Sequence, residues 1–234
     1  EQSVAEQQGA SSSSSSSSSS WTPSKKAKQA LAPGFEAART GDLGALRRIV
    51  DSKPEMTASG SSTSRTCWDP VTSVDRIHGS TALMWAAGAG HVDVCRFLVE
   101  ECGANPLSRQ KSRRSFGGRT ALHWAARRGH LNVCRYLVEG IPPVYDDAND
   151  DGKKSTSRCC PVDVPTDDGT TAFCWAAWQG HMDVMRYLIA QGANPNATNR
   201  HGCNAAMWSV QGAGGVSQCE YLRDVLGCAF DKIN

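Results

Sequence analysis

The sequence lacks any long apolar run, and this absence excludes a membrane-spanning helix. Such a helix needs about 18 or more consecutive apolar residues, and every apolar stretch here is much shorter. No basic-then-apolar segment of the kind found in cleaved signal peptides precedes the serine run at 11–20. We therefore expect no membrane insertion.

Residue patterns typical of enzymes and metalloproteins are also missing. The ten cysteines include no Cys-x-x-Cys pair, so the usual spacing of a zinc site is absent. No Gly-x-x-x-x-Gly-Lys phosphate loop occurs, and the serines and cysteines nearest to a histidine belong to repeated segments or loops. The sequence thus predicts no enzyme activity, no cofactor, no bound metal and no small-molecule substrate.

An excess of charge of one sign is absent as well. The formal net charge is +2, which is too close to zero to favour a nucleic-acid partner. Lys25, Lys26 and Lys28 are fewer than the basic run of a nuclear localisation signal. Cys95 and Cys134 occupy equivalent places in apolar segments, where cysteine acts as a small core residue. We expect reduced thiols and a cytoplasmic or nuclear location.

What the sequence does contain is one motif written four times. It reads Gly-Arg-Thr-Ala-Leu-His-Trp-Ala-Ala-Arg-Arg-Gly-His at 118–130, with close copies at 79–91 and 169–181 and a degenerate copy at 202–212. Each copy leads into a second apolar stretch, such as 133–138. Self-similarity of this kind is typical of stacked repeat proteins. A stack of similar units offers a binding surface rather than a reaction centre.

The repeated unit predicts two short helices joined by a tight turn. Thr120 can cap a first helix over 121–128, and Gly129 can end it by adopting a left-handed backbone. The small pair Ala125-Ala126 would let a neighbouring helix approach closely. The second helix begins near 131 and ends at 140, with one apolar stripe formed by Leu131, Cys134, Leu137 and Val138. No unit can bury this stripe alone, so neighbouring units must stack.

The pattern resembles the ankyrin repeat, most fully at 118–138, closely at 79–99 and 169–189, and loosely at 202–226. The resemblance implies an all-α solenoid of about five stacked helix-turn-helix pairs. Two family preferences are not met in every copy. Alanine replaces proline at Ala82, Ala121 and Ala172, and the histidine that His123 supplies is replaced at Met84, Cys174 and Met207. We expect weaker local hydrogen bonding at those three turns.

An earlier segment, 35–50, resembles a degenerate unit, because its Ala37-Ala38 and Gly41-Asp42-Leu43 parallel the later copies. We interpret it as an N-terminal capping repeat. The predicted organisation is a disordered Ser-rich arm at 1–32, the capping repeat at 33–50, a Ser/Thr-rich insertion at 51–74, a repeat at 75–107, a repeat with a basic lead-in loop at 108–144, an acidic insertion at 145–164, a repeat at 165–198 and a degenerate repeat at 199–234 that continues past the last residue.

Long loops separate the units. Successive copies begin 39, 51 and 33 residues apart at Gly79, Gly118, Gly169 and Gly202, against a family period of about 33. The basic loop contains Arg109, Lys111, Arg113, Arg114 and Arg119, and the acidic one contains Asp146, Asp147, Asp150, Asp151, Asp163, Asp167 and Asp168. Two interpretations stay open: solvated loops, or loops that project along one edge as part of a binding site.

Two residue types recur in register. The histidines at 91, 130 and 181 would be about one helix spacing apart, ~8–10 Å, which is too far to share one metal ion. We predict that they brace turns. The tryptophans at 85, 124, 175 and 208 are predicted to pack between neighbouring helices, with ring edges reaching the groove. Trp178 is predicted to be an exposed binding hot spot.

The resemblance also implies partner-contact positions on the hairpin tips and the first helices. They are Ile77, His78, Ser80, Gly88, Ala89, Phe116, Gly117, Arg119, Arg127, Arg128, Asp167, Asp168, Thr170, Trp178, Gln179, Arg200, His201 and Cys203. We predict a protein partner with an acidic segment facing Arg119, Arg127 and Arg128 and an apolar anchor against Trp178. The alternatives are a nucleic-acid-associated module that uses the basic loop at 109–119 with stacked aromatic residues, and the targeting domain of a larger multidomain enzyme.

Overall fold

The computed structural model describes residues 31–52, 68–111, 117–141 and 160–228, together with the backbone of 144–145 and 155–156. The predictions made for the arm at 1–30, the segment 53–67, Arg113, Arg114, Phe116, the aspartates between 146 and 151, and the closing residues 229–234 lie outside the described residues. Within the described ranges, no helix has the length and apolar character needed to cross a membrane.

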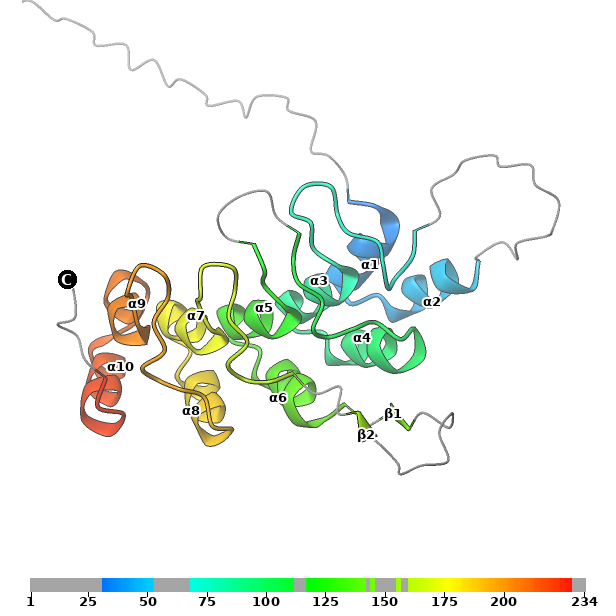
Figure 1. The fold of residues 1–234 in the computed structure, drawn as a ribbon. Helices are drawn as coiled ribbons and strands as arrows, with labels where there is room; N and C mark the ends of the chain where they lie inside the picture. The colour runs from blue at the N-terminus through cyan, green and yellow to red at the C-terminus, as the bar shows by residue number, and fades with distance from the viewer. Residues whose placement is uncertain are drawn as a thin grey trace, which may run out of the picture. The chain divides into compact units, whose positions relative to one another are not determined.

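Within the part of the chain that the structure describes, five helix pairs follow one another (Figure 1). The first helices of the pairs contact each other in sequence and form an inner layer: α1 (Pro33–Thr40), α3 (Ala82–Ala89), α5 (Ala121–Arg128), α7 (Ala172–Gln179) and α9 (Ala205–Gln211). The second helices are α2 (Leu43–Asp51), α4 (Val92–Arg96) continued by the π-helical turn η1 (Phe97–Glu101), α6 (Leu131–Glu139), α8 (Met182–Ala190), and α10 (Val216–Glu220) continued by η2 (Tyr221–Val225). The prediction of an all-α stack of helix pairs is confirmed.

One small element was not predicted. In the insertion after α6, β1 (Val144–Tyr145) pairs antiparallel with β2 (Ser155–Thr156), with Val144 opposite Thr156. The insertion thus forms a short two-stranded ribbon beside a helical stack, and it leaves the helix pairs in register.

The helix ends of the second full copy match the prediction. Helix α5 follows Thr120, whose backbone N–H donates to His123 Nδ1 at 3.1 Å, and it ends at Gly129 with φ of 76°. Two of the other copies keep a side-chain cap without histidine. Thr81 accepts from the backbone N–H of Met84 at 3.3 Å, and the Asn204 side chain accepts from that of Met207 at 3.1 Å. In the copy at 169–181 the Thr171 side chain caps no backbone N–H, and its hydroxyl donates to Cys174 Sγ at 3.6 Å, so the expected weakening is largest at that turn.

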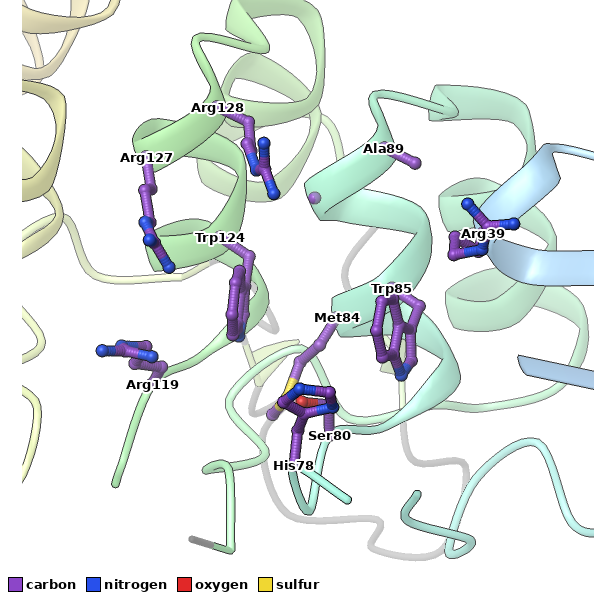
Figure 2. Close-up of a pocket in the computed structure, with 11 residues that line it drawn as sticks. Arg39, His78, Ser80, Met84, Trp85, Ala89, Arg119, Trp124, Arg127 and Arg128 are labelled. Carbon is purple, nitrogen blue, oxygen red and sulfur yellow. The ribbon is translucent and has the colours of Figure 1, made fainter. Parts of the chain in front are cut away.

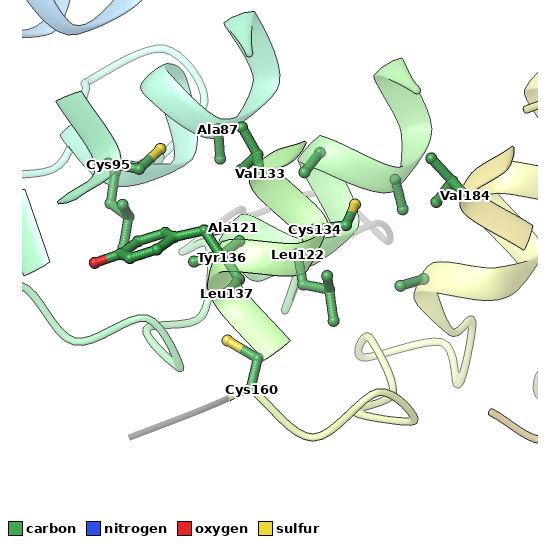
Figure 3. Packing of buried hydrophobic residues seen from close by; sticks show 14 of the residues in the cluster. Ala87, Cys95, Ala121, Leu122, Val133, Cys134, Tyr136, Leu137, Cys160 and Val184 are labelled. Atoms are coloured by element: carbon green, nitrogen blue, oxygen red, sulfur yellow. The ribbon is translucent and has the colours of Figure 1, made fainter. Parts of the chain in front are cut away.

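Alanine pairs let the inner helices pack closely. Ala86, Ala87, Ala125, Ala126, Ala176 and Ala177 are all completely buried. Below them the apolar stripes of the second helices meet, and Figure 3 shows Val133, Cys134 and Leu137 of α6 beside Ala121 and Leu122 of α5. Cys95 and Cys134 are fully buried, as predicted. Burial raises the pKa of the Cys134 thiol to about 12, so it stays protonated at neutral pH.

The histidines brace the stack, as predicted, and they do so between units. The Nε2 atoms of His91, His130 and His181 each lie 3.2 Å from a backbone carbonyl oxygen of the preceding unit, that of Arg39, Gly88 and Arg127 respectively. Each imidazole packs over the glycine that ends the preceding first helix. A Cβ added at Gly41, Gly90 or Gly129 would lie 2.5, 2.7 or 2.6 Å from the histidine Nδ1.

A second set of contacts links the outer layer. In four successive pairs, a guanidinium from one unit stacks on an aromatic ring of the next unit. The distances from Cζ to the ring centroid are 5.1 Å for Arg47 and Phe97, 5.7 Å for Arg96 and Tyr136, 5.8 Å for Arg135 and Tyr187, and 5.5 Å for Arg186 and Tyr221. Contacts of this kind contribute about 0.5–1 kcal/mol each at exposed sites.

The glycine–histidine contact yields a stability prediction. Gly129→Ala should destabilise the protein by at least about 1 kcal/mol more than Gly103→Ala, measured by urea unfolding. Both glycines have positive φ, 76° and 75°, so both variants carry left-handed strain of about 1–2 kcal/mol. Only the Cβ at 129 would also displace His181, because nothing lies within 4 Å of the one at 103. Equal losses in the two variants would contradict this account.

A second prediction concerns pH. Burial lowers the pKa of His123 to about 4, below the usual value near 6.5. The neutral imidazole therefore stabilises the fold fully above about pH 6.5, and this stability is lost as the pH falls towards 4, by about 2 kcal/mol at pH 5. His123→Met, which copies the residue at 84 and 207, should flatten the change in unfolding free energy between pH 7.5 and 5.

His130 leaves some slope in the His123→Met variant, because burial lowers its pKa as well. Asp75 and Asp168 affect the unfolding free energy in a different pH range. Their lowered pKa values affect stability only below about pH 4. An unchanged slope in His123→Met would show that His123 is not the titrating group.

Candidate functional site

A row of linked hairpins forms one edge of the stack. The first, third and fourth hairpins span 75–80, 166–170 and 199–203, and the described ends of the second are 110–111 and 117–119. Each is closed by a backbone hydrogen bond from the N–H of its first residue to the carbonyl of its last, which in the second are Gln110 and Arg119. Neighbouring hairpins are joined by the N–H groups of Lys111, Asp167 and Arg200, which donate to the carbonyls of Gly79, Gly117 and Asp168 at 3.0, 3.2 and 2.8 Å. These bonds hold the hairpin tips in register.

The side chains of three predicted contact residues are buried inside these hairpins. Ser80 is 3% exposed, and its Oγ accepts from Gln110 Nε2 at 3.2 Å. Thr170 is 1% exposed and donates to the Asp168 carboxylate at 2.8 Å. Asp168 is 8% exposed. In the structure these side chains stabilise turns, so a partner would meet their exposed neighbours first.

Asp75 fixes the first hairpin in a similar way. Its carboxylate accepts from the backbone N–H groups of Ile77, His78 and Ser80 and from Trp85 Nε1, the last at 3.2 Å. Burial alone would raise the pKa of Asp75, but these hydrogen bonds outweigh it and hold the pKa below its ordinary value. The Trp85 indole is thereby anchored to the hairpin, and His78 packs edge-on against it with ring centroids 5.6 Å apart.

The remaining predicted residues divide by exposure. Ile77, His78, Arg128, Asp167, Arg200 and His201 are exposed; Gly88, Ala89, Arg119, Arg127, Trp178, Gln179 and Cys203 are half-buried; and Gly117 is buried. Trp178 is thus less open than predicted. Its ring packs against those of Trp175 and Trp208, at 5.5 and 6.0 Å between centroids.

A cavity of about 520 Å³ opens between the inner helices and the hairpins. Figure 2 shows its lining, which comes from α1, the first hairpin, α3, the second hairpin and α5: Arg39, His78, Ser80, Met84, Trp85, Gly88, Ala89, Arg119, Trp124, Arg127 and Arg128. Seven of these were predicted as contact positions. Arg39, Met84, Trp85 and Trp124 were not, although the tryptophan ladder was predicted to reach the groove with its ring edges, and both indoles do so.

Indoles and guanidinium groups alternate beside this cavity. The Arg119 Cζ lies 5.3 Å from the Trp124 ring and 4.4 Å from the Trp175 ring. The Arg127 Cζ lies 5.6, 5.3 and 5.3 Å from the rings of Trp124, Trp175 and Trp178. Such stacking holds a guanidinium in place while its edge stays able to bind an anion. The predicted packing of the tryptophans between units is confirmed for Trp175 and Trp208, whose ring centroids lie 5.9 Å apart, whereas Trp85 and Trp124 line the cavity.

The charge of the cavity lining is positive. Among its described lining residues there are four arginines and no carboxylate. Burial lowers the pKa of Arg119 and Arg127, and the charge of a neighbouring arginine lowers each further. Arg39 is engaged by Glu36 of its own helix. Among the described residues of the basic and acidic loops, Arg109 and Asp167 form an ion pair at 3.0 Å, which neutralises part of the predicted charge contrast at the rim.

The described part of the chain has no metal centre. No group of three histidine, cysteine or carboxylate side chains in those ranges is arranged to hold an ion. What the site presents is an aromatic and cationic surface with a row of hairpin tips along it.

Comparison with known families agrees with this architecture. A family model described as "Ankyrin repeats (3 copies)" matches residues 35–150, and one described as "Ankyrin repeat" matches 168–200. The first match includes the pair α1 and α2, which the sequence analysis interpreted as a degenerate repeat. Ankyrin repeats are typically non-enzymatic modules for protein–protein interaction. With these matches and its stacked helix pairs, the chain belongs to the ankyrin-repeat family.

Proposed function

We propose that this protein is an interaction scaffold or adaptor that binds a partner protein through the groove of its inner helices and hairpin tips. The partner presents an acidic segment to Arg119, Arg127 and Arg128. The observation that carries the proposal is the cavity itself, in which four arginines and two indoles gather without a carboxylate among the described lining residues.

The energetics of the arginines favour an anionic partner. Burial lowers the pKa of the half-buried Arg119 and Arg127. Repulsion from Arg127 lowers the pKa of Arg119 further, against an opposing effect of Asp168, and repulsion from Arg128 lowers that of Arg127. A carboxylate placed against Arg127 and Arg128 would offset the burial of Arg127 and the repulsion between the two, and a guanidinium can bind it through two parallel hydrogen bonds. Charge complementarity of this kind acts mainly on the association rate and on the choice of partner.

The hairpin tips complete the surface. Ile77 is an exposed apolar side chain, 52% accessible, at the tip of the first hairpin. His78, Arg200 and His201 are exposed polar groups along the same edge. An apolar centre with a polar rim is the usual composition of a protein interface.

Two further parts of the proposal concern context. Nucleic acid is the weaker candidate, because Arg109 of the basic loop already pairs with Asp167. We place the protein in the cytoplasm or nucleus, where thiols such as Cys95 and Cys134, which are buried in the core, stay reduced. A role as the targeting domain of a larger enzyme is compatible with the same groove.

The test reverses charge in the groove. The double variant Arg127→Glu and Arg128→Glu should capture at least about tenfold less of each protein that the wild-type chain captures from lysate. The reason is that breaking a buried charge pair at an interface typically costs about 2 kcal/mol or more of binding free energy. Capture is quantified by mass spectrometry. The matched control, Arg48→Glu with Arg135→Glu, makes the same change in net charge on the outer helices α2 and α6.

Stability is measured alongside, because Arg127 also contacts three indoles. The single variant Arg128→Glu, whose side chain is exposed, should shift capture in the same direction without affecting unfolding. Identical sets of captured proteins from wild type and the groove variants would rule out this footprint.

A further inference from the structure

The spaces between successive tryptophans of the inner layer are filled differently from unit to unit. Between Trp124 and Trp175, the guanidinium groups of Arg119 and Arg127 lie over both rings. Trp175 and Trp208 contact each other directly, with ring centroids 5.9 Å apart, and the Trp178 ring packs edge-on against both. At both junctions, planar side chains of the chain itself therefore pack against the tryptophans.

The space between Trp85 and Trp124 is not closed in this way. Repeat register places Ser80 where the next unit has Arg119, and Gly88 where the next units have Arg127 and Trp178. These small residues leave the cavity of about 520 Å³, and we call this space the Trp85–Trp124 slot. Figure 2 shows the two indoles on either side of it, with Arg119 and Arg127 beyond Trp124.

The chemistry of the slot selects among planar groups. A cation would suit the indole faces, but Arg119, Arg127 and Arg128 of the lining would repel it. An aromatic ring has no such cost. It can pack against the indoles and the Met84 thioether, contacts that add to the burial of apolar area. The surrounding arginines favour acidic residues on either side of that ring.

We propose that the Trp85–Trp124 slot takes an aromatic side chain from the partner protein, flanked by acidic residues. The inference rests on the proposed function and supplies its apolar anchor. The apolar group of the partner therefore binds in this slot rather than against Trp178, because the Trp178 ring already packs against Trp175 and Trp208. The partner's ring completes the series of planar groups that the other units provide from within.

The first test uses two synthetic peptides and the full chain with 15N-labelled tryptophan. The peptides are Ac-Glu-Asp-Phe-Asp-Glu-NH2 and the same sequence with alanine in place of phenylalanine. The phenylalanine peptide should shift the indole N–H signals of Trp85 and Trp124 and bind at least about tenfold more tightly than the alanine peptide. Equal affinity, the largest shifts at Trp178 or Trp208, or no shift at millimolar peptide would each overturn the proposal.

The second test fills the slot from within. Gly88→Arg copies Arg127 of the next unit, and a Cβ at 88 would lie 3.6 Å from Trp124 Cβ, an ordinary contact. The variant adds positive charge, so attraction of an acidic peptide by charge alone would increase. If the slot holds the ring, the advantage of the phenylalanine peptide over the alanine peptide should fall to about one. Gly88→Ala is the control and should keep the advantage.

The two proposals fail differently. If both peptides bind equally and Arg127→Glu with Arg128→Glu abolishes both, the acidic groove stands and the aromatic slot is wrong. If the charge reversal changes neither peptide, the acidic groove itself is wrong. A retained advantage of the phenylalanine peptide in Gly88→Arg would also exclude the slot.

Discussion

Contact between adjacent units is the constraint on which this structure depends. Each helix pair has an apolar stripe that it cannot bury alone, and the alanine pairs of the inner helices set how closely the next pair approaches. The histidine of one unit then packs over the glycine of the preceding one and bonds to a carbonyl in it. Packing, hydrogen bonding and backbone conformation thus act at the same junction, and it recurs along the stack.

The same spacing determines what the groove can bind. Because the units are held in register, the tryptophans at equivalent positions come to lie one unit apart. Guanidinium groups lie over both Trp124 and Trp175, whereas Trp175 and Trp208 contact each other directly. The group that packs beside each pair of tryptophans depends on two residues per unit, one in the hairpin and one in the first helix. The framework is therefore repetitive, while the surface it presents changes from one unit to the next.

Periodicity allowed most of the fold to be predicted, because a repeated pattern reports burial. The bounds of α5, the glycine turns, the buried cysteines and the bracing histidines all follow from it. The site was less predictable. Exposure of Trp178 was overestimated, because Trp208 of the next unit packs against it. Burial of Ser80, Asp168 and Thr170 was missed, because it depends on hydrogen bonds within and between hairpins that no motif reports. No motif in the sequence indicated that Arg39 and Met84 line the cavity.

Gly88 has one more consequence. It lies within α3, where alanine would favour the helix by about 0.5–1 kcal/mol, yet the position is kept without a side chain and the cavity beside it stays open. The unoccupied protein thus forgoes local stability at the same place where it leaves space. Any molecule that fills this space binds only the folded state, so its concentration would raise the resistance of the whole array to heat and proteolysis. Occupancy of the cavity and folding of the array are thereby thermodynamically linked.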